Sequence, residues 1–146
     1  MSVQKTNKDR KPGLPLPRRG NEGEALQIRF HNSTAEVSRM TTEELRSNFL
    51  IESVMQADEL KLVYTHYDRM IIGGVMPVNK TIALPTYAPL KSKFFLERRE
   101  IGIINVGGDG EIKVNGKAFD LRKLDCLYVG KGSEKITFKS KKKDNP

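Results

Sequence analysis

The sequence predicts an all-β barrel or jelly roll, and three observations support this fold class. Apolar and polar residues alternate with a period of two in short segments between Leu60 and Phe138, as in strands that bury one face. Turns rich in glycine separate these segments. Only one short stretch, at 41–50, has strong helix signals. Many short strands with dense turns are typical of barrels and jelly rolls.

The net positive charge of the chain comes from its two ends. The net charge is +8, which would ordinarily suggest a nucleic acid or an anionic membrane as partner. Residues 1–20 carry +5 and residues 139–146 carry +3, so residues 21–138 are neutral. Nucleic-acid grooves need basic residues on an ordered face, usually with stacking aromatics, and neither end has an aromatic residue. We expect no nucleic-acid partner, although a binder that uses the two basic ends remains a third hypothesis.

The single cysteine, Cys126, lies in an apolar run, and we predict a buried structural thiol there. One cysteine cannot form an intramolecular disulfide, and this composition suits a reducing, cytoplasmic compartment. No apolar run reaches the length of a membrane-spanning helix, so we expect no membrane partner. The N-terminus lacks the apolar core of a secretory signal.

We predict three regions along the chain. Residues 1–25 are rich in Lys, Arg, Pro and Gly, and because prolines lack an N–H group, this region should be a disordered basic arm. A proline-rich ligand for a peptide-binding domain is the alternative. Residues 26–138 form the predicted folded domain, and residues 139–146 a basic tail.

The predicted helix covers 41–50. Thr41 and Glu44 have the spacing of a capping box, and acidic residues in a first turn suit the helix dipole. The apolar residues Leu45, Phe49 and Leu50 would dock this helix on the body. A further short turn or helix is predicted at 35–39.

The predicted strands begin at Leu60, after which apolar and polar residues alternate up to His66. Asn115-Gly116 is a strong hairpin signal, because both residues tolerate the positive φ angles of a type I′ turn. Gly73-Gly74 suggests a bend or bulge. The remaining strands are predicted at 70–72, 81–84, 93–97, 100–106, 112–114, 119–121, 124–129 and 136–138.

The sharpest charge cluster is Glu97-Arg98-Arg99-Glu100. On a strand, Glu97 and Arg99 would face one way, and Arg98 and Glu100 the other. An arginine of either Glu/Arg pair could bind the carboxylate of a sugar acid through two parallel hydrogen bonds. The alternative is a set of ion pairs that fixes strand register or a subunit contact, and both interpretations stay open here.

Common catalytic patterns are not found in the sequence. The two histidines, His31 and His66, lie far apart and in no zinc-binding spacing. There is no Gly-x-Ser-x-Gly elbow. The glycine-rich stretch 107–110 precedes a predicted strand, whereas a phosphate-binding loop opens a helix. We therefore predict no catalytic and no metal-binding residue on this chain.

Several motifs in order resemble one known family, 5-keto-4-deoxyuronate isomerase, also called 4-deoxy-L-threo-5-hexosulose-uronate ketol-isomerase. The resemblance covers roughly residues 32–139. Its motifs are Arg46-Ser47-Asn48-Phe49-Leu50-Ile51-Glu52, Val63-Tyr64-Thr65-His66-Tyr67-Asp68-Arg69, Gly73-Gly74-Val75-Met76-Pro77, Phe95-Leu96-Glu97-Arg98-Arg99-Glu100, Ile104-Asn105-Val106-Gly107-Gly108 and Leu127-Tyr128-Val129-Gly130-Lys131-Gly132.

The resemblance implies a bicupin, two tandem double-stranded β-helix (jelly-roll) barrels. The family interconverts 5-keto-4-deoxyuronate and 3-deoxy-D-glycero-2,5-hexodiulosonate in pectin degradation, commonly as a hexamer. Its zinc is held by three histidines and a glutamate in the second, C-terminal barrel. This chain would end near the close of the first barrel. It would therefore be an N-terminal cupin-like half-barrel with one short helix, without its closing strand and without the zinc-binding half.

The cupin ligand positions of this first barrel can be compared with the sequence. Glu100 would occupy the glutamate position. The two preceding histidine positions fall on Lys93 and Phe95, or on Phe94 and Leu96, and the late one falls on Lys135. Three of four ligands are thus replaced by residues of other types, and we predict no cofactor on this chain.

We therefore expect a structural domain that is inactive alone, packs against the second barrel and forms a homo-oligomer. The substrate of the whole enzyme would be a deoxyuronate. The predicted contacts to the edge of the substrate site or to a subunit interface are Glu97, Arg98, Arg99 and Lys131. The alternative is a non-catalytic cupin-like module for sugar-acid binding or assembly.

Overall fold

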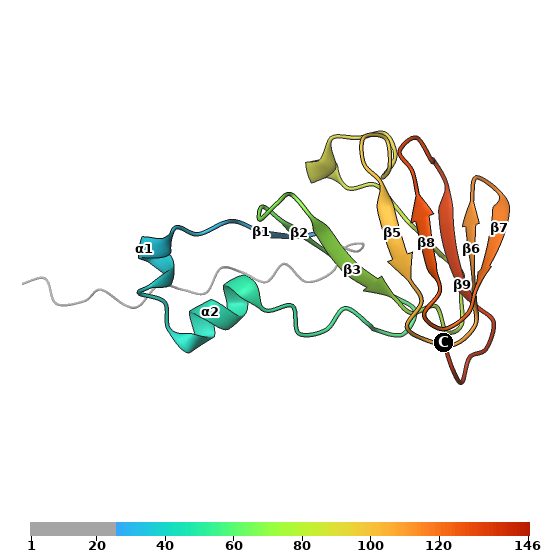
Figure 1. Ribbon diagram of the computed structural model, residues 1–146, viewed down its shortest axis with the longest axis horizontal. Coiled ribbons are helices and arrows are strands. Elements are labelled where there is room, and N and C mark those ends of the chain that lie inside the picture. Colours follow the sequence, from blue (N-terminus) through green and yellow to red (C-terminus); the bar gives the residue numbers. More distant parts are fainter. Residues whose placement is uncertain (1–25) are drawn as a thin grey trace, which may run out of the picture.

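The computed structural model describes residues 26–146, and strands and turns dominate it (Figure 1). The predicted arm at 1–25 lies outside the described residues. The strands form three sheets, ordered β1-β2-β3, β4-β9-β6-β7 and β5-β8, so the all-β, jelly-roll-like prediction is confirmed. In chain order the elements are β1 (Gln27–Arg29), α1 (Thr34–Val37), α2 (Thr42–Phe49), β2 (Leu60–Thr65), β3 (Ile71–Val75), β4 (Ile82–Ala83), the 3-10 helix η1 (Ala88–Leu90), β5 (Ile101–Ile104), β6 (Gly110–Val114), β7 (Lys117–Leu121), β8 (Cys126–Val129) and β9 (Ile136–Ser140).

The strand pairs of the half-barrel are nested in the chain. β6 pairs with β7, the flanking β5 pairs with β8, and the outermost β4 pairs with β9, all antiparallel. The innermost turn is the predicted Asn115-Gly116 hairpin, whose φ angles are 49° and 87°. Glycine is suited to the second position because it adopts positive φ at no steric cost. Nested antiparallel pairs of this kind are how a jelly roll wraps two sheets around one core.

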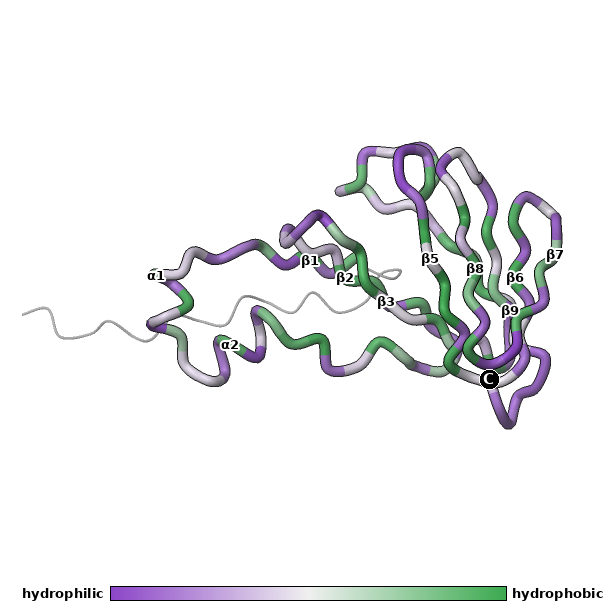
Figure 2. Tube along the Cα trace, in the orientation of Figure 1, coloured by the Kyte–Doolittle hydropathy of each residue, from purple (hydrophilic) through white to green (hydrophobic). Residues whose placement is uncertain are grey.

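The core lies between the sheets of the half-barrel. Leu96 is its most buried residue, with no exposed surface, and Ile112 of β6 pairs with Phe138 of β9 on the same buried face. Figure 2 shows hydrophobic segments along β3, β5 and β8 and hydrophilic ones in the loops that join the strands. The other members of the buried cluster are Leu60, Ile82, Leu84, Leu90, Phe95, Leu121, Val129 and Ile136.

The two helices lie away from the sheets (Figure 1). Each begins with a capping box, Ser33 with Glu36 in α1 and Thr41 with Glu44 in α2. The predicted helix with its cap at Thr41 is confirmed, as is a short helix near 35–39, whose cap at Ser33 was not predicted. No residue of either helix is buried. Of the apolar residues expected to dock α2, Phe49 contacts the ring of Tyr67, yet 45% of its surface is exposed.

Three predictions about these strands are wrong. Gly73-Gly74, expected to form a bend or bulge, lie inside β3 and pair one to one with Leu62 and Lys61 of β2. The segment 93–97 forms turns and bends, not a strand, so the expected alternation of faces at Glu97 to Glu100 does not arise. The cause is local, because side chains bond the backbone of this segment and Lys91 adopts a left-handed φ of 48°. The thiol of Cys126 is exposed, not buried, because Cys126 and Tyr128 occupy the outward positions of β8.

The side chain of Asp58, just before β2, forms hydrogen bonds with the turn that follows β3. Its Oδ1 accepts hydrogen bonds from the backbone amides of Val78 (2.8 Å), Asn79 (2.7 Å) and Lys80 (3.3 Å). Its Oδ2 accepts one from the side chain of Asn79 (2.7 Å). The bonds from the backbone and side chain of Asn79 are the main cause that lowers the pKa of Asp58 from 3.8 to about 2.

We predict that this carboxylate makes stability depend on pH in acid. A pKa that is lower in the folded state means that the contribution is fully present above pH 3.8 and is lost as pH falls towards 2. Urea unfolding of the wild type and of Asp58→Asn between pH 2 and 6 measures this. The difference in unfolding free energy should be largest at pH 6 and shrink below pH 4. A difference that stays constant with pH would contradict the assignment.

Candidate functional site

The candidate site is the rim of the half-barrel formed by the loop from β4 to β5, residues 84–100. It lies at the end of the barrel opposite the C-terminus (Figure 1). η1 has Pro89 in its first turn. It is followed by Lys91, whose backbone adopts the left-handed conformation. The loop then returns through Phe95 and Leu96, which are buried. Two buried side chains in an irregular loop fix its position over the core.

Glu97 and Arg98, two of the predicted site residues, bond the backbone of their own loop. Glu97 Oε2 accepts a hydrogen bond from the amide of Lys93 at 2.9 Å. The Nη2 of Arg98 donates to the carbonyl of Lys91. Charge-assisted hydrogen bonds to backbone groups are among the stronger ones, so these two side chains hold the loop in shape.

Arg99 and Lys131 lie at the same rim. The Nη1 of Arg99 donates to the carbonyl of Phe95 at 3.1 Å, and its guanidinium lies 5.5 Å from the centroid of the Phe95 ring. The amide of Gly132 donates to the carbonyl of Leu96 at 2.7 Å, which ties the turn containing Lys131 to the loop. The structure therefore brings together the four residues that the sequence predicted.

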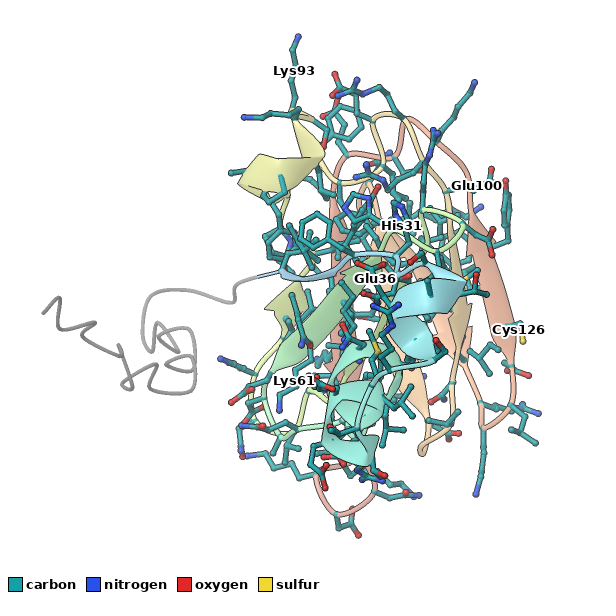
Figure 3. All side chains as sticks on the ribbon, turned by 90° about the vertical axis from the view of Figure 1, so that its left-hand side faces the viewer. His31, Glu36, Lys61, Lys93, Glu100 and Cys126 are labelled. Carbon is teal, nitrogen blue, oxygen red and sulfur yellow. The ribbon has the colours of Figure 1, made fainter. Side chains whose placement is uncertain are left out.

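A surface hollow of about 540 Å³ adjoins this cluster and is rich in positive charge. Among residues 26–146, those that line it include one acidic residue, Glu97, against two lysines and one arginine. Lys93 projects from this end of the molecule (Figure 3). Such a surface suits a carboxylate or another anion of small size. Its lining residues are Thr86, Tyr87, Ala88, Lys91, Ser92, Lys93, Glu97 and Arg98.

Glu100, the residue that the resemblance places at the cupin glutamate position, forms a hydrogen bond on the molecular surface. The hydroxyl of Tyr128 donates to its Oε2 at 2.5 Å, and this hydrogen bond raises the pKa of Tyr128. Both side chains are exposed, and Figure 3 shows Glu100 at the edge of the molecule. Tyr128 was not predicted as a site residue, although its outward position on β8 follows from the alternation of that strand.

Among residues 26–146, no group of three His, Cys, Asp or Glu side chains lies close enough to hold a metal ion. His66 stacks on the ring of Phe30, with centroids 4.7 Å apart and an interplanar angle of 16°. His31 lies near Glu36 at the start of α1 (Figure 3), and its charge contributes to the lowered pKa of Glu36, which is caused mainly by the backbone amide of Ser33. The two histidines thus have local roles.

A second, larger hollow of about 860 Å³ lies between α2, the segment after it and the sheet of β1 and β2. Arg29 of β1 lines it. The Nε and Nη1 atoms of Arg29 are buried, and neither has a hydrogen-bond partner in the described part of the chain. Sequence reasoning missed this residue, because nothing in the pattern distinguishes one arginine at a strand end from the others.

A buried N–H group without a hydrogen-bond partner destabilises a fold by about 1–3 kcal/mol. We predict that Arg29→Met, which keeps the aliphatic length, raises the unfolding free energy of the chain by about 1 kcal/mol. Arg39→Met, at an exposed arginine, is the matched control and should change little. Urea unfolding measures both, and a loss of stability in Arg29→Met would show that the guanidinium is paired.

No helix of the described residues has the length and apolarity that crossing a membrane requires.

Comparison with known proteins finds relatives that share one name. No protein-family profile matches the chain. It is 48% identical over 120 residues to a protein of Formosa agariphila, a match that covers 82% of this chain and 43% of the relative. It is 44% identical over 121 residues to a protein of Halalkalibacterium halodurans (83% of this chain, 44% of the relative). A protein of Escherichia coli O157:H7 is 44% identical over 117 residues (79% and 42%). All three are named 4-deoxy-L-threo-5-hexosulose-uronate ketol-isomerase, and the chain spans less than half of their length.

Proposed function

We propose that this chain, which matches curated 4-deoxy-L-threo-5-hexosulose-uronate ketol-isomerases over about four-fifths of its length, is the N-terminal structural domain of such an isomerase and is inactive alone. The observation that carries the proposal is the coverage of the match. About four-fifths of this chain corresponds to 43% of the Formosa agariphila relative. The remaining part of that relative has no counterpart among the matched residues.

Ketol isomerisation moves hydrogen between neighbouring carbons of an open-chain sugar. It needs a base, an acid and an electrophile that polarises the carbonyl. The rim offers a carboxylate and two guanidinium groups, but Glu97, Arg98 and Arg99 each bond the backbone of their own loop. This geometry supports a structural role for the rim. The acid–base chemistry then belongs to the part of the enzyme that this chain does not span.

The family implies a zinc ion, and the residues of this chain do not fit one. At the cupin ligand positions stand Lys93, Phe95 and Lys135 beside Glu100. A phenyl ring has no lone pair to donate, lysine is protonated at neutral pH, and Glu100 is engaged by the hydroxyl of Tyr128. We therefore assign no step of the reaction to a metal on this chain.

Oligomer formation is part of the proposal. The protruding helices and the exposed Phe30 and Phe49 are features that a neighbouring domain or subunit would cover. Under this proposal the deoxyuronate binds to the assembled enzyme, and this chain contributes packing surfaces and the rim.

The test is complementation. The part of the Formosa agariphila relative beyond the match is expressed separately, and deoxyuronate turnover and zinc content are measured for each polypeptide and for the mixture. We expect neither turnover nor zinc for this chain alone, and turnover with bound zinc in the mixture. Turnover by this chain alone would overturn the proposal.

The alternative is a non-catalytic module for sugar acids, and the positively charged hollow at the rim favours it. It predicts uronate binding by the chain alone. Calorimetric titration with galacturonate measures this, and the double variant Lys93→Ala/Arg98→Ala should weaken such binding at least tenfold. Lys123→Ala/Arg122→Ala, at the far side of the strands, is the control. Equal titration curves for both double variants would remove the alternative.

A further inference from the structure

A further hollow, of about 200 Å³, lies between the sheet of β1 and β2 and the segment that contains η1. Tyr64 and His66 line it from the end of β2, and Arg99 lines it from the residues just before β5. The remaining lining residues are apolar: Ile28, Pro89 and Leu90. Apolar walls that carry a few polar groups are typical of sites for small molecules.

The geometry of β2 explains why two of the polar residues meet here. Residues two apart on a strand point to the same face of a sheet, and Tyr64 and His66 are two apart. Ile28 of β1 pairs with Tyr64 in the parallel register, so its side chain lies on that face too. The amide of His66 donates to the carbonyl of Arg29 at 2.9 Å, which extends the pairing of β1 and β2 as far as His66.

Ring contacts fix the orientation of the His66 imidazole. It stacks on Phe30, with centroids 4.7 Å apart, and the ring of Tyr64 meets it edge-on at 5.1 Å and an interplanar angle of 83°. Stacked and edge-to-face arrangements are the ones that aromatic pairs prefer. The imidazole is therefore held by packing, and neither of its nitrogen atoms forms a hydrogen bond with residues 26–146.

The guanidinium of Arg99 is held in place, and most of its donors stay available. Its Nη1 donates to the carbonyl of Phe95 at 3.1 Å, and the group lies 5.5 Å from the centroid of the Phe95 ring. Within the described part of the chain, Arg99 forms no ion pair and no second side-chain hydrogen bond. A guanidinium carries several N–H donors in a fixed plane, which suits two parallel hydrogen bonds to a carboxylate.

The hydroxyl of Tyr64 is the third polar group at this hollow. The ring of Tyr64 is half-buried and packs against the core. A tyrosine hydroxyl in such a place usually has a hydrogen-bond partner, yet this one has none among residues 26–146. Three sets of unused hydrogen-bonding groups, one of them permanently charged, thus line the same small hollow.

These groups indicate the class of ligand. No acidic residue of the described chain lines the hollow, so the positive charge of Arg99 favours an anion. A hydroxyl and an imidazole each donate and accept hydrogen bonds, which suits the hydroxyl groups of a ligand. The volume is below the roughly 300–1,000 Å³ of pockets for drug-sized molecules, so the ligand has only a few carbon atoms.

We propose that this hollow binds a small hydroxycarboxylate, with its carboxylate on Arg99 and its hydroxyl groups on Tyr64 and His66. The carbon chain of the ligand lies against Ile28 and Leu90. The site is separate from the larger hollow at the rim, which Arg98 lines and Arg99 does not. The inference is independent of the proposed function, because it involves no turnover and no zinc.

The test is a titration of residues 1–146 with D-glycerate at constant ionic strength, followed by nuclear magnetic resonance. His31 and His66 are the two histidines of the chain, and His31→Gln assigns their ring signals. We expect the ring signals of His66 to shift and saturate with D-glycerate. Glycerol, which lacks the carboxylate, is the matched probe and should give no saturable shift. Equal shifts with both probes, or no saturable shift with D-glycerate, would overturn the proposal.

A pair of arginine variants locates the anion. Arg99→Gln removes the charge at this hollow and should weaken the binding of D-glycerate about tenfold or more, because hydrogen bonds to charged groups are the stronger ones. Arg98→Gln removes the same charge from the rim hollow and should leave the affinity unchanged. Equal weakening in both variants would mean that the acid does not bind selectively at Arg99, and would overturn the proposal.

Tyr64→Phe keeps the ring and removes only the hydroxyl, so it tests the site without disturbing the loop that Arg99 holds. It should weaken binding about threefold or more, whereas Tyr128→Phe, on the outer face of β8, should not. Wild-type affinity in Tyr64→Phe would contradict the proposed class of ligand. An affinity that falls as the protein concentration rises would mean that a carboxylate of a second copy fills the hollow, and would also overturn the proposal.

Discussion

Leu96→Ala is expected to lower the unfolding free energy of this chain by about 3 kcal/mol. Leu96 has no exposed surface and lies in the loop that carries the rim. Truncation removes its contacts with the core and leaves a cavity, because close-packed surroundings relax only in part. Urea unfolding followed by circular dichroism measures the loss.

Leu124→Ala is the matched control for this prediction. The same atoms are removed, but 70% of Leu124 is exposed, so the change should stay within about 0.5 kcal/mol. Should the two variants lose equal stability, Leu96 would not be part of a packed core. Leu96→Ala should also loosen the rim, since the carbonyl of this residue holds the amide of Gly132.

Asn105→Ala is expected to cost about 2 kcal/mol. The side-chain amide of Asn105 donates to the carbonyls of Gly108 (2.6 Å) and Leu121 (3.2 Å), and its Oδ1 accepts from the amide of Gly107 (3.1 Å). This one side chain therefore joins the turn after β5 to the end of β7. Its removal takes this partner from the amide of Gly107 and the carbonyl of Gly108, and one of its bonds from the carbonyl of Leu121, in a half-buried place.

Two further variants sharpen this prediction. Asn105→Asp keeps the acceptor for Gly107 but loses both donors and places a negative charge against two carbonyls, so it should be as unstable as Asn105→Ala above pH 5. Val106→Ala, at a neighbour with 55% of its surface exposed, is the control. A wild-type stability in Asn105→Asp would show that the two donated bonds contribute nothing.

The parts of the fold that the sequence predicted are those fixed by short-range chemistry. Thr41 and Glu44 cap α2 through atoms three residues apart, and Asn115-Gly116 turns because those two residues adopt positive φ. Strands with one buried face, such as β6, are visible in the alternation around Ile112. In each case the information lies within a few neighbouring residues.

The segment 93–97 was mistaken for a strand because its apolar residues, Phe94, Phe95 and Leu96, are typical of strands. A strand does not form there because the side chains of Glu97 and Arg99 form hydrogen bonds with the backbone of this segment. The periodicity of apolar residues does not reveal such bonds. Cys126 was mistaken for a core residue because its run is apolar on both faces, and only the folded structure shows that the face of β8 that carries Cys126 and Tyr128 is exposed.

The candidate site was predicted in part. Glu97, Arg98 and Arg99 stand out as a charge cluster, and Lys131 joined them through the resemblance and a turn motif. Their bonds to the loop backbone are local, but they depend on the turn that the loop adopts. The contact of Tyr128 with Glu100 and the burial of Arg29 Nε and Nη1 depend on residues that lie far apart in the sequence.

The most direct test of the central claim is deoxyuronate turnover by purified residues 1–146 with added zinc, beside a chimera in which residues 1–146 are followed by the part of the Formosa agariphila relative beyond the match. The account predicts no turnover by the chain alone and turnover by the chimera under the same conditions. Zinc-dependent turnover by residues 1–146 would contradict it, and would place the chemistry in the half-barrel itself.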